Sequence, residues 1–267
     1  LRGRATSIGR QLSFHPVIDL IKGWARIADG DDGATAFGKL EKGVRGIEPD
    51  AAGEIVPFIG RLLGLTLPPA PAERLRGIES QALEKLIMVA VRKLVASAAQ
   101  RRPLIIIIED VHWADASTLD VLKPLLRLAA EHAVLFINIF RPGYEDTSER
   151  LLNHVRAAHQ DIHAEIRLEP LTHDQAGLMI CNLLKAGQLP ADLCDAVVEK
   201  AAGNPYFVEE IIRSLIDEGA VRRSSGKFSL ARPVEEIVIP DTISEILLNR
   251  VDRLEPKTHA LLQTASV

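Results

Sequence analysis

Two neighbouring acids, Glu109 and Asp110, follow directly after a run of aliphatic residues at 104–108. If the run is a strand, successive side chains point to opposite faces, so the two carboxylates have different surroundings. One can hold Mg²⁺ through its oxygens, and the other can lie near a water that attacks a phosphoanhydride. Asp115 either caps the next helix or adds a third carboxylate. We therefore predict Glu109 and Asp110 as catalytic residues, and these two with Asp115 as metal ligands.

The same acids also have an ordinary structural explanation. Acidic residues are favoured near the N-terminal ends of helices, so a strand that ends in Glu-Asp before a turn is common. His112 and Trp113, which follow the acids, are better explained as a buried packing pair than as catalytic groups. The strand and the acids alone therefore leave both interpretations open.

The elements that must position these acids alternate between strand and helix. An aliphatic run without polar alternation predicts a strand covered on both faces, as in a parallel sheet. Helices are expected at 73–99, 117–131 and 148–159, and strands at 104–108, 133–140 and 164–168. Strands separated by helices of these lengths predict crossover connections and a parallel sheet. The first thirty or so residues are expected to form a loop and then a helix.

The second half of the chain is predicted to be mostly helical. Thr172 and Gln175 have the spacing of a capping box, which predicts a helix that begins at this point. Further helices are expected at 193–202, 205–218 and 241–254, with a small hairpin at 220–230 around Ser225 and Gly226. Gly203 can end one helix, Asn204 or Gly203 can cap the next, and Pro205 suits its first turn.

The segment LIIIIEDVHWAD at 104–115 resembles the extended Walker B motif of AAA-type and STAND-class P-loop ATPase modules. Such modules occur behind class III adenylate and guanylate cyclase domains and in large LuxR-type regulators. The family pattern is an aliphatic run, Glu-Asp, an aliphatic residue and His-Trp-Ala-Asp, and every element is present.

Four later segments resemble the same family in the same order. They are Phe-Arg-Pro at 140–142, LEPLT at 168–172, GNPYFVEE at 203–210, and IPDT at 239–242 followed by NRVDRL at 249–254. The resemblance is strong from about residue 73 onward and weak before it. It implies a sensor-like role for Arg141 and nucleotide contacts from Gly203, Asn204 and Pro205, of which Pro205 offers a flat apolar ring to a purine. From the residues alone, Arg141 can equally be a surface arginine before a proline turn, and 203–205 can be a plain junction between two helices.

The resemblance also implies the fold class, the domains and the cofactors. The expected fold is α/β, with a partial P-loop NTPase parallel sheet followed by a helical lid and the start of a winged-helix-like domain. The expected domains are an ATPase core at 1–170 with its Walker B strand at 104–110, a lid at 171–237 with the Gly-Asn-Pro motif and the hairpin, and a winged-helix-like start at 238–267. The expected cofactors are ATP and Mg²⁺.

No segment of the sequence is a credible phosphate-binding loop. That loop needs G-x-x-x-x-G-K-[ST] after a strand. Residues 33–40 match its first seven positions, but Leu40 replaces the hydroxyl and Asp31 and Asp32 precede the match. Residues 3–10 have the wrong spacing and no lysine. The resemblance places the loop upstream, so we expect an N-terminally truncated module that alone binds ATP weakly or not at all.

Composition excludes several other classes of protein. The net charge of −4 and the dispersed basic residues argue against nucleic-acid binding by this segment. Cys181 and Cys194 lack the neighbours of a metal site. No apolar run approaches the roughly 20 residues of a membrane span, and no signal peptide is visible, so a cytoplasmic location is expected.

Three functions compete. The first is an ATP-binding and ATP-hydrolysing regulatory switch in a multidomain signalling protein, in which nucleotide closes the lid. The second is a degenerate scaffold that never hydrolyses ATP, and the third is a DNA-binding transcriptional regulator. The expected partners are other domains of the same polypeptide, such as an N-terminal cyclase or C-terminal helical repeats, together with nucleotide-dependent self-association.

Overall fold

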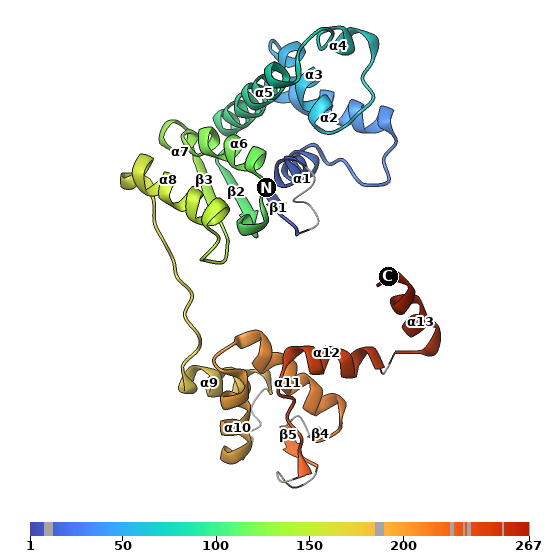
Figure 1. Ribbon diagram of the computed structural model, residues 1–267, viewed down its shortest axis with the longest axis vertical. Helices are drawn as coiled ribbons and strands as arrows, with labels where there is room; N and C mark the ends of the chain where they lie inside the picture. The colour runs from blue at the N-terminus through green and yellow to red at the C-terminus, as the bar shows by residue number, and fades with distance from the viewer. Residues whose placement is uncertain are drawn as a thin grey trace. The chain divides into compact units, whose positions relative to one another are not determined.

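The computed structural model describes the chain apart from residues 8–12, 185–189, 225–226, 232, 234–235, 253 and 267. It divides into two compact units, Leu1–Glu165 and Ile166–Val267, each with its own hydrophobic core (Figure 1). The two units are described separately below.

A three-stranded parallel sheet forms the centre of the first unit. Its strands are β1 (Arg2–Arg4), β2 (Leu104–Glu109) and β3 (Val134–Asn138), in the order β1-β2-β3. The predicted strands at 104–108 and 133–140 and their parallel pairing are therefore confirmed. Because β2 is central, its carboxyl end lies between the ends of both neighbours, and Glu109 is in register with Arg4.

Helices account for most of the rest of this unit. They are α1 (His15–Ala25), α2 (Gly33–Ile47), α3 (Ala52–Leu62), α4 (Pro69–Glu73), α5 (Ser80–Arg101), α6 (Ala116–Leu126), α7 (Leu128–Glu131) and α8 (Arg150–Ala158). Short turns of 3₁₀ and π helix occur at Val111–Trp113, Gln160–Ile162 and Glu145–Glu149. Aliphatic side chains from α1, α2, α3, α5, α6 and β2 form one continuous core.

Only one face of the sheet is covered by the described residues. Ile106 and Ile108 are buried on the helix-covered face, whereas Ile105 and Leu135 on the other face are 53% and 55% exposed. The expectation of a strand covered on both faces is therefore wrong for this part of the chain. The side chains on both faces of β2 are aliphatic, but the helices of this unit pack against only one of these faces.

The third predicted strand, at 164–168, is not a strand in the structure. Residues 163–172 have no regular structure, and Ile166 and Leu168 are almost fully exposed. Their alternation with polar residues resembles a strand, but they pair with none of the described strands. The third strand is β1, which lies within the segment predicted to be a loop. Three residues with a central glycine are too few to show a strand pattern.

The second unit is a helical assembly with one hairpin. It contains α9 (His173–Leu183), α10 (Ala191–Ala201), α11 (Pro205–Asp217), β4 (Val221–Ser224), β5 (Lys227–Leu230), α12 (Ile243–Asp252) and α13 (Pro256–Ala265). The capping box of Thr172 and Gln175 and the antiparallel hairpin are confirmed, although Ser225 and Gly226 lie outside the described residues. Ile246 of α12 is buried in the same core, so α12 packs with the predicted lid helices.

Candidate active site

The two predicted acids lie at the carboxyl edge of the sheet. Glu109 is the last residue of β2, and Asp110 begins the turn that leads into Val111–Trp113. Asp110 has a left-handed backbone with φ of 55°, a conformation that Asp and Asn adopt more readily than most residues. The side chains of Glu109 and Asp110 are 21% and 32% exposed, so solvent reaches both carboxylates.

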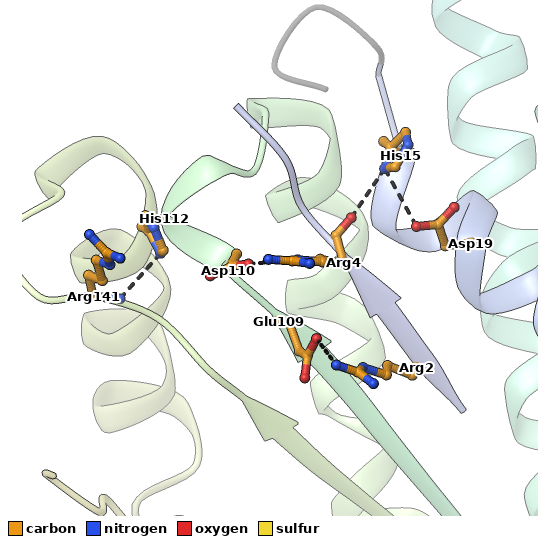
Figure 2. A network of polar contacts seen from close by, with 8 residues as sticks. All are labelled: Arg2, Arg4, His15, Asp19, Glu109, Asp110, His112 and Arg141. Atoms are coloured by element: carbon orange, nitrogen blue, oxygen red, sulfur yellow. Dashed lines mark hydrogen bonds and ion pairs between the residues drawn. The ribbon is translucent and has the colours of Figure 1, made fainter. Parts of the chain in front are cut away.

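Each acid forms an ion pair with an arginine from β1 (Figure 2). Arg2 Nη2 lies 2.5 Å from Glu109 Oε2, and Arg4 Nε donates to Asp110 Oδ2 at 2.9 Å. Parallel pairing and side-chain alternation place both arginines on the open face of the sheet, where Glu109 also points. The sequence analysis missed these residues, and the only available signal was the Arg-Gly-Arg spacing of two.

His15 and Gly3 hold β1 in place beside the acids. His15 Nδ1 lies 3.1 Å from the carbonyl oxygen of Arg4 and 3.7 Å from Asp19 Oδ2, as Figure 2 shows. A Cβ atom on Gly3 would lie 2.1 Å from the carbonyl oxygen of Pro16, so only glycine allows the strand to lie this close to α1. The backbone that carries the two arginines is therefore tightly constrained.

Asp115 has a different role from its neighbours. It is the N-cap of α6: one carboxylate oxygen accepts from Thr118 N at 3.2 Å, and the other accepts from the Thr118 hydroxyl. Of the two roles that the sequence left open, the structure shows the cap. Within the described residues, no group of three His, Cys, Asp or Glu side chains could hold a metal ion. We therefore leave Asp115 out of the metal site.

His112 joins the turns that follow β2 and β3. It is buried, and its Nδ1 accepts from the backbone N–H of Arg141 at 3.2 Å, while Thr147 donates to its carbonyl oxygen. The ring of Tyr144 packs against His112 and Trp113, with centroid distances of 4.9 and 5.6 Å. His112 is thus a packing and positioning residue, as the sequence indicated.

Arg141 is held at its backbone, but its side chain is open to solvent. The residue is exposed, and its guanidinium forms no ion pair with any described residue. It follows β3, one strand away from the acids on the same edge of the sheet. An unpaired guanidinium in this position is available to an anion such as phosphate.

The rejected phosphate-loop match at 33–40 is a helix. These residues open α2, Asp32 caps the helix through Thr35 N at 2.7 Å, and Lys39 Nζ lies 2.5 Å from Asp31 Oδ2. The Lys39 bond is the largest of the contacts that lower the pKa of Asp31, so the lysine is committed to a carboxylate. The rejection is confirmed. The segment at 3–10 is also rejected as a phosphate loop. In that segment Gly3 lies in β1, and Gly9 lies outside the described residues.

The predicted Gly-Asn-Pro motif forms a tight junction in the second unit. Gly203 has φ of 76°, and its carbonyl oxygen accepts from Leu171 N at 2.8 Å. Asn204 Oδ1 accepts from the N–H groups of Tyr206 and Phe207 at 3.0 and 3.3 Å, which caps α11, and Pro205 is its first residue. Asn204 is therefore a cap, as the local pattern predicts.

Pro205 also borders an open, mostly apolar groove of about 420 Å³. The other lining residues come from α9 and from the segment before it: Leu171, Gln175, Leu178, Met179, Asn182 and Leu183. The lining combines aliphatic and thioether side chains with two carboxamides. Flat apolar ligands with polar edges suit such a surface.

Comparison with known proteins supports the division into two units. Residues 1–137 match the family model described as AAA ATPase domain, and residues 172–227 match a domain of unknown function, DUF8739. An uncharacterized protein of Rhizobium meliloti (strain 1021) is 28% identical over 206 residues, which are 76% of this chain and 18% of that protein. No solved structure matches the chain. The two family matches lie in different units.

Proposed function

This chain belongs to the AAA ATPase domain family, and from that premise we propose that it is an ATP-binding and ATP-hydrolysing switch module of a multidomain signalling protein. The observation that carries the proposal is the delivery of Glu109 and Asp110 to the carboxyl edge of a parallel sheet. Ligands of open α/β sheets bind at this edge.

The two acids fit Mg²⁺. Both are oxygen donors with partly exposed carboxylates, and magnesium is commonly held by one or two carboxylates together with waters and substrate phosphates. When bound, Mg²⁺ would neutralise charge on the phosphate oxygens as the phosphoanhydride breaks. We leave Asp115 out of the proposed site, because its carboxylate caps α6 through Thr118.

In this proposal, metal binding, proton acceptance and contacts to the phosphate are assigned to different residues of the chain. Glu109 and Asp110 would hold the metal, and one of the two carboxylates would orient the attacking water and accept its proton. Arg141 supplies positive charge to the phosphate oxygens. His112 positions Arg141 through its bond to the backbone N–H.

The Gly203-Asn204-Pro205 junction is proposed to contact the purine base. Pro205 presents its ring in the apolar groove, and the carboxamides of Gln175 and Asn182 can bond to polar edge atoms of a base. Gly203 and Asn204 act indirectly in this proposal, because they hold the turn that places Pro205.

The test is ATP turnover by the longest natural polypeptide that contains this sequence. The substitution E109Q keeps the size of the side chain and removes its charge. It is expected to lower turnover at least a hundredfold, because general acid–base groups contribute about 10² to 10⁴. The matched control is E41Q, which removes an exposed acid paired with Arg45 away from the sheet edge. Equal turnover in E109Q and E41Q would refute the hydrolytic role.

A degenerate scaffold that never hydrolyses ATP is the second candidate. Two observations support this second candidate. Both acids are paired with arginines, and the described residues contain no phosphate-binding loop. Calorimetric titration of this chain with Mg·ATP is expected to show weak binding or none. Turnover by the longer polypeptide separates the scaffold from the switch.

The setting of the module is also proposed. The chain spans 18% of the length of the Rhizobium relative, which is consistent with other domains in the same polypeptide, such as a cyclase or helical repeats. We also propose a cytoplasmic location and nucleotide-dependent self-association. In the described part of the chain, no helix is long and apolar enough to cross a membrane.

A further inference from the structure

Positive and negative charges at the sheet edge are matched in pairs, Arg2 with Glu109 and Arg4 with Asp110. We propose that Arg2 and Arg4 are positioning residues that form a charge latch: they hold the two acids, and the latch must open before the acids accept Mg²⁺. This inference rests on the proposed metal-binding role of Glu109 and Asp110.

The backbone of the latch is fixed by contacts that do not involve the two ion pairs. The N–H of Ile107 donates to the carbonyl oxygen of Leu1, and the N–H of Ala5 donates to that of Glu109, both at 2.9 Å. His15 contacts the Arg4 carbonyl oxygen, and Gly3 lies directly against α1. The backbone from which both arginine side chains extend is therefore held beside the acids.

The arginine side chains themselves are free to turn away. They are 68% and 64% exposed, whereas the acids are 21% and 32% exposed. Solvated ion pairs of this kind contribute little to stability, so each pair can open by rotation of the arginine without movement of the strand. The latch is thus weak enough to open and close while β1 stays paired.

The closed latch opposes a cation in two ways. Each arginine occupies one of the two oxygens of its carboxylate, and its positive charge repels the ion. Once released, a guanidinium presents planar donors that match phosphate oxygens. Binding of a cation and release of the arginines are therefore coupled, and removal of the arginine charges should strengthen cation binding by the acids.

The experiment measures Mn²⁺ binding to this chain by electron paramagnetic resonance, at low ionic strength because salt screens exposed charges. The double variant R2Q/R4Q is expected to bind Mn²⁺ about tenfold more tightly than the wild type, and R4Q about threefold. R45Q makes the same charge change at an exposed pair with Glu41 and should bind as the wild type does. R2K/R4K keeps the charges and should also stay within twofold of the wild type.

Amide exchange at Ile107 and Ala5 shows whether β1 stays paired in each variant. If R2Q/R4Q loses this protection, the single variant R4Q decides the outcome. The latch is overturned if the glutamine variants bind Mn²⁺ no more tightly than R45Q, or if R2K/R4K gains as much as R2Q/R4Q. Adding E109Q and D110N to R2Q/R4Q must abolish the gain, and a gain that persists places the ion elsewhere and also overturns the proposal.

Failure of the latch and failure of the proposed function give different results. If E109Q abolishes ATP turnover in the longer polypeptide while R2Q/R4Q leaves Mn²⁺ binding unchanged, the latch is wrong and the function stands. If R2Q/R4Q strengthens Mn²⁺ binding while E109Q leaves turnover intact, the latch stands and the hydrolytic role is wrong.

Discussion

Replacement of Gly203 by alanine tests the junction that positions Pro205. A Cβ atom at this position would lie 2.6 Å from the carbonyl oxygen of Leu171, 2.7 Å from Pro170 Cβ and 3.0 Å from Leu171 N. The backbone of Gly203 also has φ of 76°, which disfavours any residue with a Cβ. The substitution therefore combines backbone strain with a collision against backbone atoms that cannot easily move.

The magnitude follows from these two effects and from one hydrogen bond. Left-handed strain costs about 1 kcal/mol after the smaller entropy of the unfolded alanine chain is allowed for. Overpacking against backbone adds roughly 1–3 kcal/mol. If the backbone moves to relieve the collision and the hydrogen bond from Leu171 N to the Gly203 carbonyl oxygen breaks, the loss of that bond costs about 1 kcal/mol more. We expect the free energy of unfolding of the second unit to fall by about 3 kcal/mol.

The assay is hydrogen exchange of the whole chain followed by mass spectrometry of peptides from α9 and α11. A loss of about 3 kcal/mol accelerates exchange through unfolding of the unit about a hundredfold. Gly219 provides the matched control, because it has φ of 69° but its Cβ would meet only the Arg222 side chain at 3.7 Å. G219A should therefore cost about 1 kcal/mol, from strain alone. Equal effects of G203A and G219A would refute the collision.

Two further predictions concern the first unit. D115A removes the cap of α6 and should lower the free energy of unfolding by about 1–2 kcal/mol, measured as faster amide exchange at Thr118. D115N keeps a capping oxygen and should retain most of the stability. An equal loss of stability in both variants would contradict the capping role. Burial, followed by the charge of Lys123, lowers the pKa of His154 below its usual 6.5. The unfolded chain therefore binds more protons than the folded chain as the pH drops through 6.5, and the stability of the fold decreases. H154Q should therefore reduce the loss of Tm between pH 7.5 and 5.5, measured by tryptophan fluorescence, and an unchanged pH dependence would contradict this.

Features that depend on local chemistry were predictable from the sequence. The aliphatic run at 104–108 predicts β2 because such runs suit buried strands. Thr172 and Asn204 predict helix starts because their side chains satisfy N–H groups within three residues along the chain. Asp32 likewise explains why the match at 33–40 is a helix and not a phosphate loop.

Features that depend on distant parts of the chain were not predictable in the same way. The Arg2–Glu109 and Arg4–Asp110 pairs join residues 107 and 106 positions apart, and no periodicity records such pairing. The strand β1 is too short to show a pattern of its own and is defined by its pairing with β2. Conversely, residues 164–168 have the alternation of a strand but pair with none of the described strands, so local pattern alone does not make them a strand.

The left-handed backbone of Asp110 has a consequence for how this site can change by mutation. A single base change converts an aspartate codon into one for asparagine or for glycine, and both residues tolerate this backbone conformation well. The carboxylate can therefore be lost in one mutational step with little cost to the fold. Natural variants that keep the sheet and have lost the acid are thus easily reached, and selection for stability alone would not remove them.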